Sequence, residues 1–452
     1  MMQRRHLLGA TGAAAATGLL GGLALPGLAA GEDYRAIVVI YLNGGNDGNN
    51  TLVPTDGAYG DYQTGRGNLA LAKSSLLGLS GTAAGHTFGV HPALSALVPL
   101  YSQGRLGFIS NVGPLVEPST GAKVLSNTVK IPPFLMSHSD QTAIVQGWTV
   151  SDDTSGWAGR GLEYLPSSLK NAVSAVTMDN NRTLVLGKQS TVSFMPPGGS
   201  RWWGTADLAQ PQSAAAQSLN RMAKWQFSNA YEAEYARTFG AALADSTFLT
   251  KAFMAAQAPS ADFGSNNAHG DLPENLRSLA SVLPVFKAQG LKRQVFLKHW
   301  GGFDTHTNQL GTSSDNTQDT QLAILGKALA AFDATNKANG MDSNVITLVM
   351  TEFGRTLRPG SGGGSEHAWG NHWMVVGGPV AGGTVYGSFP SLVLGGVDDG
   401  DSGKNGRWVP STSSDQVGAT LMEWLGLPSS QLTTVFPSLV NFPAKTLPLL
   451  RV

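Results

Sequence analysis

The sequence predicts an α/β fold with a mostly parallel central sheet. Three observations indicate it: short apolar runs rich in β-branched residues, helical patterns between these runs, and polar turns after several of them. Continuous apolar runs of this kind are typical of strands buried on both faces of a sheet. With 452 residues and 42% hydrophobic residues, the chain is long enough to bury a sizeable core.

The expected elements alternate along most of the chain. The expected strands are 36–42, 105–112, 294–299, 345–350 and 373–377. The expected helices are 91–103 and 317–336, together with a helical region at 214–257 and 273–289. We interpret this region as a helical insertion, at about 214–290, in a single domain that spans 31–452.

The N-terminus predicts export. Arg4 and Arg5 precede a weakly apolar stretch that ends in small residues near Ala30, as in a twin-arginine signal peptide at 1–30. The alternative is an uncleaved membrane anchor, which the many glycines and alanines disfavour. The expected location is therefore periplasmic or secreted by the Tat pathway. No later segment reaches the ~18 apolar residues of a membrane span.

Composition excludes several classes of function. The chain has no cysteine, so disulfides, zinc–thiolate sites, iron–sulfur clusters and cysteine nucleophiles are excluded. Its 30 basic and 30 acidic residues balance, and removal of the signal would leave 28 against 30. A nucleic-acid partner is not expected, because such proteins usually show a basic patch.

Two polar clusters follow the strands expected at 36–42 and 294–299. Asp47 lies in the turn after the first, where either a metal ligand or a backbone-capping turn fits the pattern. Asp304 and His306 lie in the turn after the second. A carboxylate and an imidazole two residues apart can share one divalent ion, but they can equally form a hydrogen bond that orders the loop.

Two further clusters lie near the strands at 345–350 and 373–377. Glu352 can bind a metal, and Arg355 can bind a substrate anion or form a buried ion pair with Glu352. A glycine-rich loop then leads to His367 and His372, which are candidate ligands or acid–base groups together with Glu366. The joint placement of four clusters after strands predicts one shared site at the sheet edge.

A nucleophile is less well defined. The chain has no G-x-S-x-G elbow, which argues against an α/β-hydrolase serine. Ser137, in the segment Met136-Ser137-His138-Ser139-Asp140, is the best local candidate. The alternative is that Ser137 or Ser139 is a helix N-cap, which their spacing fits better.

An ordered set of motifs resembles the Tat-exported family known as domain of unknown function 1501. The set begins with VVIYLNGGNDGNNTLVP (38–54), VHPALSALVPLYSQGRLGFISNVG (90–113), SHSDQ (137–141) and GWAGR (156–160). It continues with GGFDTHTNQ (301–309), TEFGRT (351–356), EHAWGNHW (366–373), GGTVYG (382–387) and SSDQVGATLMEWLG (413–426). The resemblance covers nearly the whole chain after the predicted signal.

That family resembles a branch of the alkaline phosphatase/sulfatase-like superfamily. The resemblance implies a three-layer α/β/α sandwich with one or two divalent ions, such as zinc, manganese or calcium, at the strand ends. The implied metal ligands are Asp47, Asp304, His306, Glu352, His367 and His372. Phe353 stands where a histidine is expected, Ser137 matches the nucleophile position, and Arg355 and His367 complete the implied catalytic set.

Two hypotheses follow for the function. The first is an exported metal-dependent hydrolase of phosphate- or sulfate-type esters, with a small-molecule or polymer substrate. The second is a non-catalytic exported scaffold or assembly partner on the same fold, with a co-exported protein as its partner.

Overall fold

A nine-stranded sheet forms the centre of the structure, a computed structural model that describes residues 33–147, 153–197 and 212–451. The strand order is β13-β5-β12-β9-β1-β8-β6-β7, with β14 also paired to β5. The strands are β1 (Arg35–Leu42), β5 (Leu106–Gly113), β6 (Ala175–Thr177), β7 (Val192–Phe194), β8 (Arg293–Trp300), β9 (Val345–Thr351), β12 (Asn371–Val376), β13 (Val385–Tyr386) and β14 (Thr412–Ser413). Each of the five strands expected from the sequence is present. The predicted signal peptide at 1–30 lies outside the described residues.

Most neighbouring strands are parallel, as predicted. β1 pairs in parallel with β8 on one side and β9 on the other, and β6 pairs in parallel with β7 and β8. β12 is antiparallel to both of its neighbours, β5 and β9. It therefore begins at the edge of the sheet where β1, β8 and β9 end.

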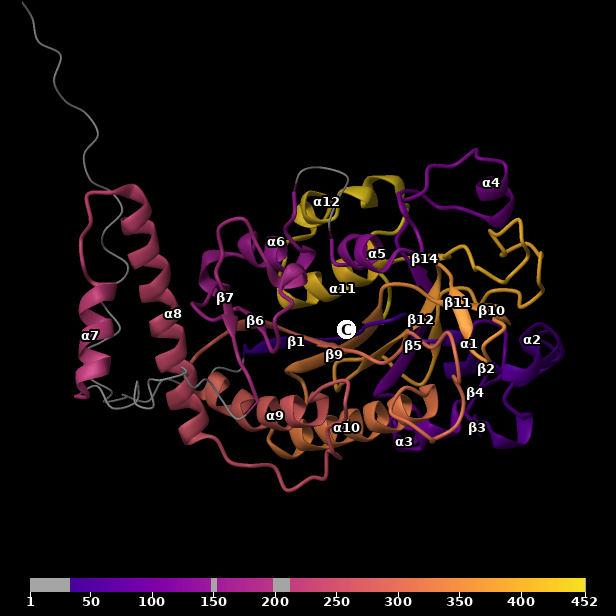
Figure 1. The fold of residues 1–452 in the computed structure, drawn as a ribbon, viewed down its shortest axis with the longest axis horizontal. Coiled ribbons are helices and arrows are strands. Elements are labelled where there is room, and N and C mark those ends of the chain that lie inside the picture. The colour runs from indigo at the N-terminus through magenta and orange to yellow at the C-terminus, as the bar shows by residue number, and fades with distance from the viewer. Residues whose placement is uncertain (1–32, 148–152, 198–211, 452) are drawn as a thin grey trace, which may run out of the picture.

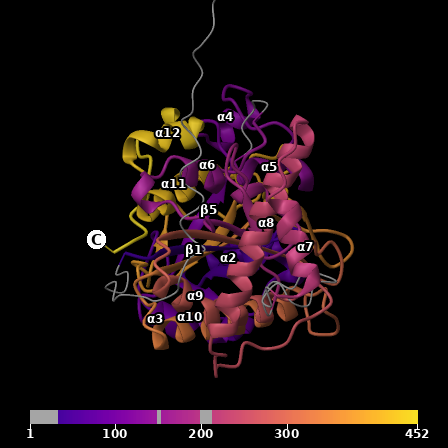
Figure 2. The same ribbon diagram turned by 90° about the vertical axis from the view of Figure 1, so that its left-hand side faces the viewer.

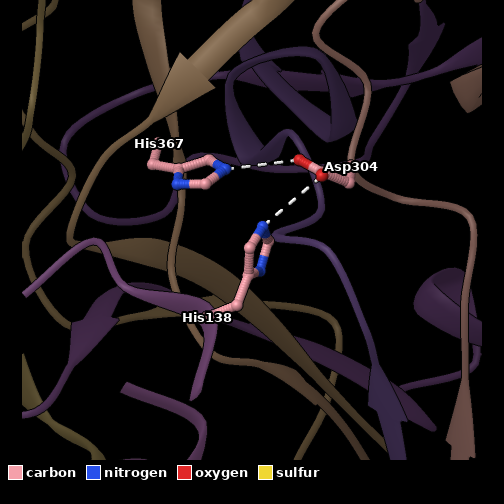
Figure 3. Close-up of side chains that lie close together, drawn as sticks. All are labelled: His138, Asp304 and His367. Carbon is pink, nitrogen blue, oxygen red and sulfur yellow. Dashed lines mark hydrogen bonds and ion pairs between the residues drawn. The ribbon is translucent and has the colours of Figure 1, made fainter. Parts of the chain in front are cut away.

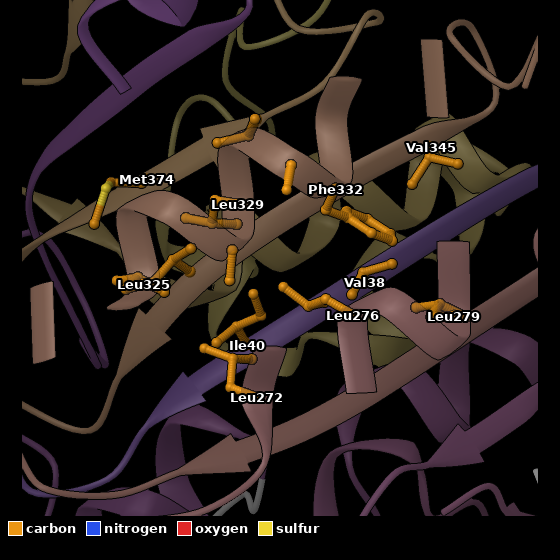
Figure 4. Close-up of a cluster of buried hydrophobic side chains, with 14 of the residues drawn as sticks. Val38, Ile40, Leu272, Leu276, Leu279, Leu325, Leu329, Phe332, Val345 and Met374 are labelled. Carbon is orange, nitrogen blue, oxygen red and sulfur yellow. The ribbon is translucent and has the colours of Figure 1, made fainter. Parts of the chain in front are cut away.

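β1 is the core strand because both of its faces are apolar. Val38 and Ile40 face one hydrophobic cluster, and Ile37, Val39 and Tyr41 face another, all with no exposed surface. Figure 4 shows Val38 and Ile40 packed against leucines of two neighbouring helices. This burial on both faces explains why the strand reads as a continuous apolar run.

Helices cover both faces of the sheet and complete a three-layer α/β/α sandwich (Figures 1 and 2). Leu272, Leu276, Leu325 and Leu329 belong to one hydrophobic cluster, and Val417 and Leu421 belong to the other. The helices of the first face are α3 (Val98–Ser102), α9 (Leu272–Ala288) and α10 (Gln318–Ala338). Those of the second are α5 (His138–Val145), α6 (Trp157–Glu163), α11 (Ser414–Leu425) and α12 (Leu432–Val435).

The helical region expected at 214–290 divides into two parts. α7 (Ala214–Ala223) and α8 (Ala230–Ala255) form a hairpin that stands out from one end of the sandwich (Figure 1). α9 instead belongs to the layer on the sheet, because its apolar stripe of Leu272, Leu276, Leu279 and Leu283 is fully buried. Among the described residues, no helix is both long enough and apolar enough to cross a membrane.

Smaller elements shape the edge of the sheet. β10 (Arg355–Pro359) and β11 (Ser365–His367) form an antiparallel hairpin that places Arg355 opposite His367. The other small elements are α1 (Gly48–Thr51), α2 (Tyr59–Arg66) and α4 (Gly121–Leu125), and the three-stranded sheet of β2 (Leu52–Pro54), β4 (Phe88–Val90) and β3 (Leu77–Gly78). The hairpin matters most for function, because it carries two residues of the candidate site.

Candidate metal centre

Four chain segments meet at the edge where the central parallel strands end. The turns after β1, β8 and β9 lie there because the three strands are parallel neighbours. The segment that ends in His367 lies there because β12, which follows it, runs antiparallel. The sequence predicted this edge as the site, and the antiparallel strand is the feature that adds the fourth segment.

Two glycines after β1 allow these segments to approach closely. Gly44 has a φ of +115°, and a Cβ at this position would lie 2.3 Å from the backbone nitrogen of Asp304. Gly45 has a φ of +78°, and a Cβ there would lie 2.4 Å from the ring of Phe353. Both positions require glycine, for conformation and for space. The Gly-Gly turn therefore sets the distance between the loops of the site.

His138, Asp304 and His367 form the centre of the site (Figure 3). One side-chain nitrogen or oxygen of each lies within 4.8 Å of those of the other two. Nε2 of His138 is 3.4 Å from Oδ2 of Asp304, and Nε2 of His367 is 3.3 Å from Oδ1. His306 joins them, because its Nε2 lies 3.0 Å from Oδ1 of Asp304 and 3.0 Å from Nε2 of His367.

Each imidazole is held through its other nitrogen. Nδ1 of His138 lies 3.0 Å from Oε1 of Glu352, and Nδ1 of His306 lies 2.7 Å from Oε2 of Glu366. Nδ1 of His367 donates to the backbone carbonyl of Met136 at 2.9 Å. Anchoring of one ring nitrogen by a carboxylate or carbonyl is the arrangement that orients metal-binding histidines.

This anchoring decides which nitrogen carries the lone pair. A carbonyl or an ionised carboxylate only accepts, so the anchored Nδ1 of each ring carries the hydrogen. In the neutral rings, Nε2 is then an acceptor, and all three Nε2 atoms face the Asp304 carboxylate, another acceptor. Four acceptors facing one another require a shared proton or a cation.

The electrostatic surroundings favour positive charge at this point. Burial would raise the pKa of Asp304, but the hydrogen bond and charge of Arg355, followed by the charges of His306 and His138, lower it. The hydrogen bond that His138 donates to Glu352 raises the pKa of His138 against the effect of burial. Burial lowers the pKa of His367. An ionised carboxylate thus lies beside imidazoles of unlike proton affinity, which suits a bound cation.

The residues present fit a divalent cation. Two imidazole nitrogens, of His138 and His367, and one carboxylate oxygen of Asp304 form a donor set that zinc and other transition metals accept, and Nε2 of His306 lies beside it. Nε2 of His138 is buried and has no hydrogen-bond partner among the described residues. A buried nitrogen without a partner costs free energy unless something binds it, and a cation at this position would do so.

Arg355 has a different role from the predicted one of binding a substrate anion. Its side chain has no exposed surface. Its guanidinium donates to the backbone carbonyls of Gly44, Gly45, Phe303 and Ser365 and to the Asp304 carboxylate. Because these acceptors occupy the guanidinium, Arg355 holds three loops together and fixes Asp304 instead of reaching a substrate.

Glu352 orients a neighbour. Its Oε1 accepts from the backbone nitrogen of Gly44 at 2.8 Å and faces Nδ1 of His138, while its Oε2 accepts from the Thr351 hydroxyl at 2.9 Å. Both oxygens are therefore occupied, and the side chain is 2% exposed. The structure places Glu352 behind His138, as the group that fixes this ring, and not among the atoms that face Asp304.

Asp47 and His372, two other predicted ligands, lie in closed networks. Asp47 is fully buried, pairs with Arg66, accepts from Gln309 at 2.5 Å and caps α1 through the backbone nitrogen of Asn49. Nδ1 of His372 accepts from the backbone nitrogen of Asn111 at 3.1 Å. Burial lowers the pKa of His372 to about 3. The protein binds both carboxylate oxygens of Asp47 and Nδ1 of His372, and neither residue belongs to the group of ligand atoms around Asp304.

Ser137 is the N-cap of α5. Its hydroxyl accepts from the backbone nitrogen of Asp140 and donates to the Asp140 carboxylate at 2.5 Å. This is the capping role that the sequence left open as the alternative. The hydroxyl is bound within its own helix turn, so the structure gives no support for it as a nucleophile.

His138 is the ligand candidate that sequence reasoning missed. It was visible only as the neighbour of Ser137 and Asp140, because no strand precedes it. Phe353 occupies the position at which a histidine was expected, and its ring packs against those of His138 and His367, with centroid distances of 4.9 and 4.6 Å. Phe353 thus supplies an apolar wall on which two imidazoles rest.

Comparison with solved structures gives weak likenesses to a consistent group. A phosphonate monoester hydrolase from Silicibacter pomeroyi is 11% identical, and the match covers 87% of this chain and 74% of that chain with a TM-score of 0.33. The C-terminal periplasmic domain of EcEptC from Escherichia coli, solved in complex with zinc, is 9% identical. This match covers 77% of this chain and 74% of that chain with a TM-score of 0.34. The 2-O GAG sulfatase BT1596 is 10% identical, and the match covers 88% of this chain and 72% of that chain with a TM-score of 0.29.

Likeness at this level says nothing about activity. No curated protein sequence matches the chain. A family model described as "Protein of unknown function (DUF1501)" matches residues 34–405, which include every residue of the candidate metal centre. The chain belongs to this family.

Proposed function

We propose that this protein is an exported metal-dependent hydrolase of phosphate- or sulfate-type esters. The observation that carries the proposal is the convergence of three imidazole Nε2 atoms on the carboxylate of Asp304, each ring anchored through Nδ1. In proteins this arrangement is typical of metal sites.

His138, His306, His367 and Asp304 would hold the ion. Zinc or manganese suits this nitrogen-rich set better than calcium, which prefers oxygen ligands. A bound divalent ion would polarise an ester oxygen and lower the pKa of a water molecule. Glu352, Glu366 and the Met136 carbonyl keep the imidazoles in position, and Arg355 keeps Asp304 in position.

Glu366 is the exposed acid–base group of the pair that it forms with His306. Their side chains are 37% and 50% exposed, so the pair reaches solvent at the open side of the site. Both nitrogens of His306 are engaged, Nδ1 by Glu366 and Nε2 at the ion, so Glu366 is the group of this pair that would take a proton from an attacking water or give one to a leaving group. The open side accommodates a small-molecule ester as well as a polymer.

The test measures metal and activity together. The mature protein, residues 31–452, is purified without chelator, and its metal content is measured beside Asp304→Ala and His138→Gln. His86→Gln is the matched control, because His86 also pairs with a carboxylate, Asp56, at 3.0 Å but lies outside the site. All four proteins are assayed on a panel of phosphate and sulfate esters.

We expect about one ion per chain in the wild type and in His86→Gln, and a loss in both site variants. Ester hydrolysis should fall with the metal. Equal metal content in all four proteins would refute the metal centre. Bound metal in the wild type without hydrolysis of any ester would favour the second candidate, a non-catalytic scaffold or assembly partner. One observation motivates this candidate: Arg355, the predicted anion-binding residue, is occupied by the protein itself.

Export is tested separately. The paired arginines Arg4 and Arg5 support it. Replacement of both by lysine should leave the full-length protein in the cytoplasm, as measured by cell fractionation. Unchanged export of this variant would contradict the Tat assignment.

A further inference from the structure

A cavity lies behind α5, away from the candidate metal centre. It has a volume of about 580 Å³ and is lined by four prolines together with Leu115, Val116, Phe134 and Ile144. A volume of this size is typical of sites that bind small molecules, and such sites are mostly apolar with a few polar groups. The cavity plays no part in the proposed function.

α5 separates the cavity from the metal centre. His138, Gln141 and Thr142 face the sheet edge, where Gln141 donates to the Glu352 carbonyl and Thr142 accepts from Tyr41. Asp140 and Ile144, on the opposite face of the same helix, line the cavity. Spacing of three to four residues divides the two faces in this way. The cavity therefore adjoins the site without opening onto the same residues.

The polar groups of the cavity are acidic. Asp140 and Asp415 come from the first turns of α5 and α11, and both line the wall. Among the described residues, side chains reach only Oδ2 of either carboxylate: Ser137 and Ser139 bind that of Asp140, and Ser438 binds that of Asp415. One oxygen of each carboxylate is thus left for a donor.

The cationic side chain among the lining residues already makes hydrogen bonds within the protein. Arg160 lines the cavity, but its guanidinium donates to the backbone carbonyls of Ser155, Gly147 and Val435. Burial raises the pKa of the Asp415 carboxyl, although Ser438 and Arg160 oppose this, and a cationic donor at this carboxylate would offset the cost of burial. The charge of Arg160 still acts on Asp415, but two carboxylates outnumber one arginine in the wall, so the cavity matches a positively charged ligand group better than an anionic one.

We propose that this cavity binds a small apolar molecule that carries a protonated amine. The apolar part packs against the prolines, Leu115, Val116 and Ile144, and the amine donates to Asp140 and Asp415. Phe134 lines the cavity with a ring that is 73% exposed and a φ of +53°, a strained conformation for a side chain of this size. It would cover the apolar part of the ligand.

The experiment compares three ten-carbon probes with one apolar chain and different heads. Decylamine, decanol and decanoate are titrated into the mature protein by calorimetry at neutral pH, below their micelle concentrations. We expect one decylamine per chain, bound at least roughly tenfold more tightly than decanol or decanoate, as one charge-assisted hydrogen bond predicts. Equal or tighter binding of decanol or decanoate would overturn the assignment of the amine, and binding of none of the three would overturn the site.

Variants locate the binding. Asp415→Asn should remove most of the preference for decylamine over decanol, and Val116→Trp should fill the cavity and weaken decylamine binding at least about tenfold. Val393→Trp is the matched control, because Val393 is 43% exposed and lies outside the cavity. Ile144→Trp fills the same space from another wall if Val116→Trp fails to fold. Unchanged binding in a folded cavity-filling variant would place the ligand elsewhere and refute the proposal.

Discussion

Asp47 and Asp304 occupy equivalent positions in the fold and have opposite surroundings. Each follows a central parallel strand and a glycine turn, and each contacts an arginine. Asp47 has no exposed surface, and Arg66, Gln309 and Asn49 bind both of its oxygens. The side chain of Asp304 is 48% exposed, and its Oδ2 lies 3.4 Å from Nε2 of His138, which has no hydrogen-bond partner in the described part of the chain.

The difference teaches that position at a strand end does not make a carboxylate a ligand. A carboxylate whose oxygens are all hydrogen-bonded within the protein stabilises the fold. A carboxylate that faces the lone pairs of imidazole nitrogens is a candidate to bind a cation. Four predictions test this contrast, from the largest expected effect to the smallest.

Loss of Asp47 should destabilise the protein strongly and leave metal binding intact. Asp47→Ala leaves Arg66 buried without its partner, so we expect the free energy of unfolding to fall by about 3–5 kcal/mol. Chemical denaturation of the metal-free protein measures this. Asp304→Ala should cost less, because Arg355 keeps its four backbone acceptors, yet it should abolish metal binding. A larger stability loss from Asp304→Ala than from Asp47→Ala would reverse the comparison.

Removal of the metal should lower stability by mass action. With free metal at 100 to 1,000 times the dissociation constant, the bound ion adds about 2.7–4.1 kcal/mol. Thermal unfolding with and without chelator should therefore show a lower Tm for the wild type in chelator. Asp304→Ala is the control and should show no shift. A chelator effect of equal size in this variant would place the metal elsewhere.

Glu352→Gln should weaken the metal centre without removing a ligand. The amide can still accept from Gly44, but it no longer favours the imidazole orientation and basicity that the carboxylate gives to His138. We expect metal affinity to fall roughly 10- to 100-fold. Competition with a metal-binding dye measures it. A complete loss of metal would show that Glu352 is itself a ligand.

His372 should make stability depend on pH. Burial lowers its pKa to about 3, so only the unfolded chain binds this proton between pH 6.5 and 3. Its stabilising effect is therefore present above pH 6.5 and is lost as the pH falls, with a slope of about 1.4 kcal/mol per pH unit. Denaturation at several pH values should show a shallower slope for His372→Gln, since glutamine still offers an acceptor to Asn111. An identical slope would show that His372 titrates normally.

Much of the fold could be read from the sequence because strands and helices are set by local pattern. The apolar run of β1 predicted a strand buried on both faces, and the sheet has it at its centre. The antiparallel direction of β12 could not be read, because strand direction depends on the hairpin of β10 and β11 that precedes it.

The sequence by itself determined that the turns after β1, β8 and β9 reach the edge of the sheet, because the ends of buried parallel strands are local features. It also determined the types of side chain available there: carboxylates and imidazoles, without cysteine. These facts are independent of how distant segments pack.

Only the tertiary structure decided which of these side chains meet. Arg66 and Asp47 lie 19 positions apart, and His138 and Glu352 lie 214 apart, so neither pair is visible in local spacing. Packing decides which side chains each carboxylate meets: an arginine for Asp47, and imidazoles beside an arginine for Asp304. The charge of these partners, and whether they carry a nitrogen lone pair that faces the carboxylate, distinguish a structural carboxylate from a candidate ligand.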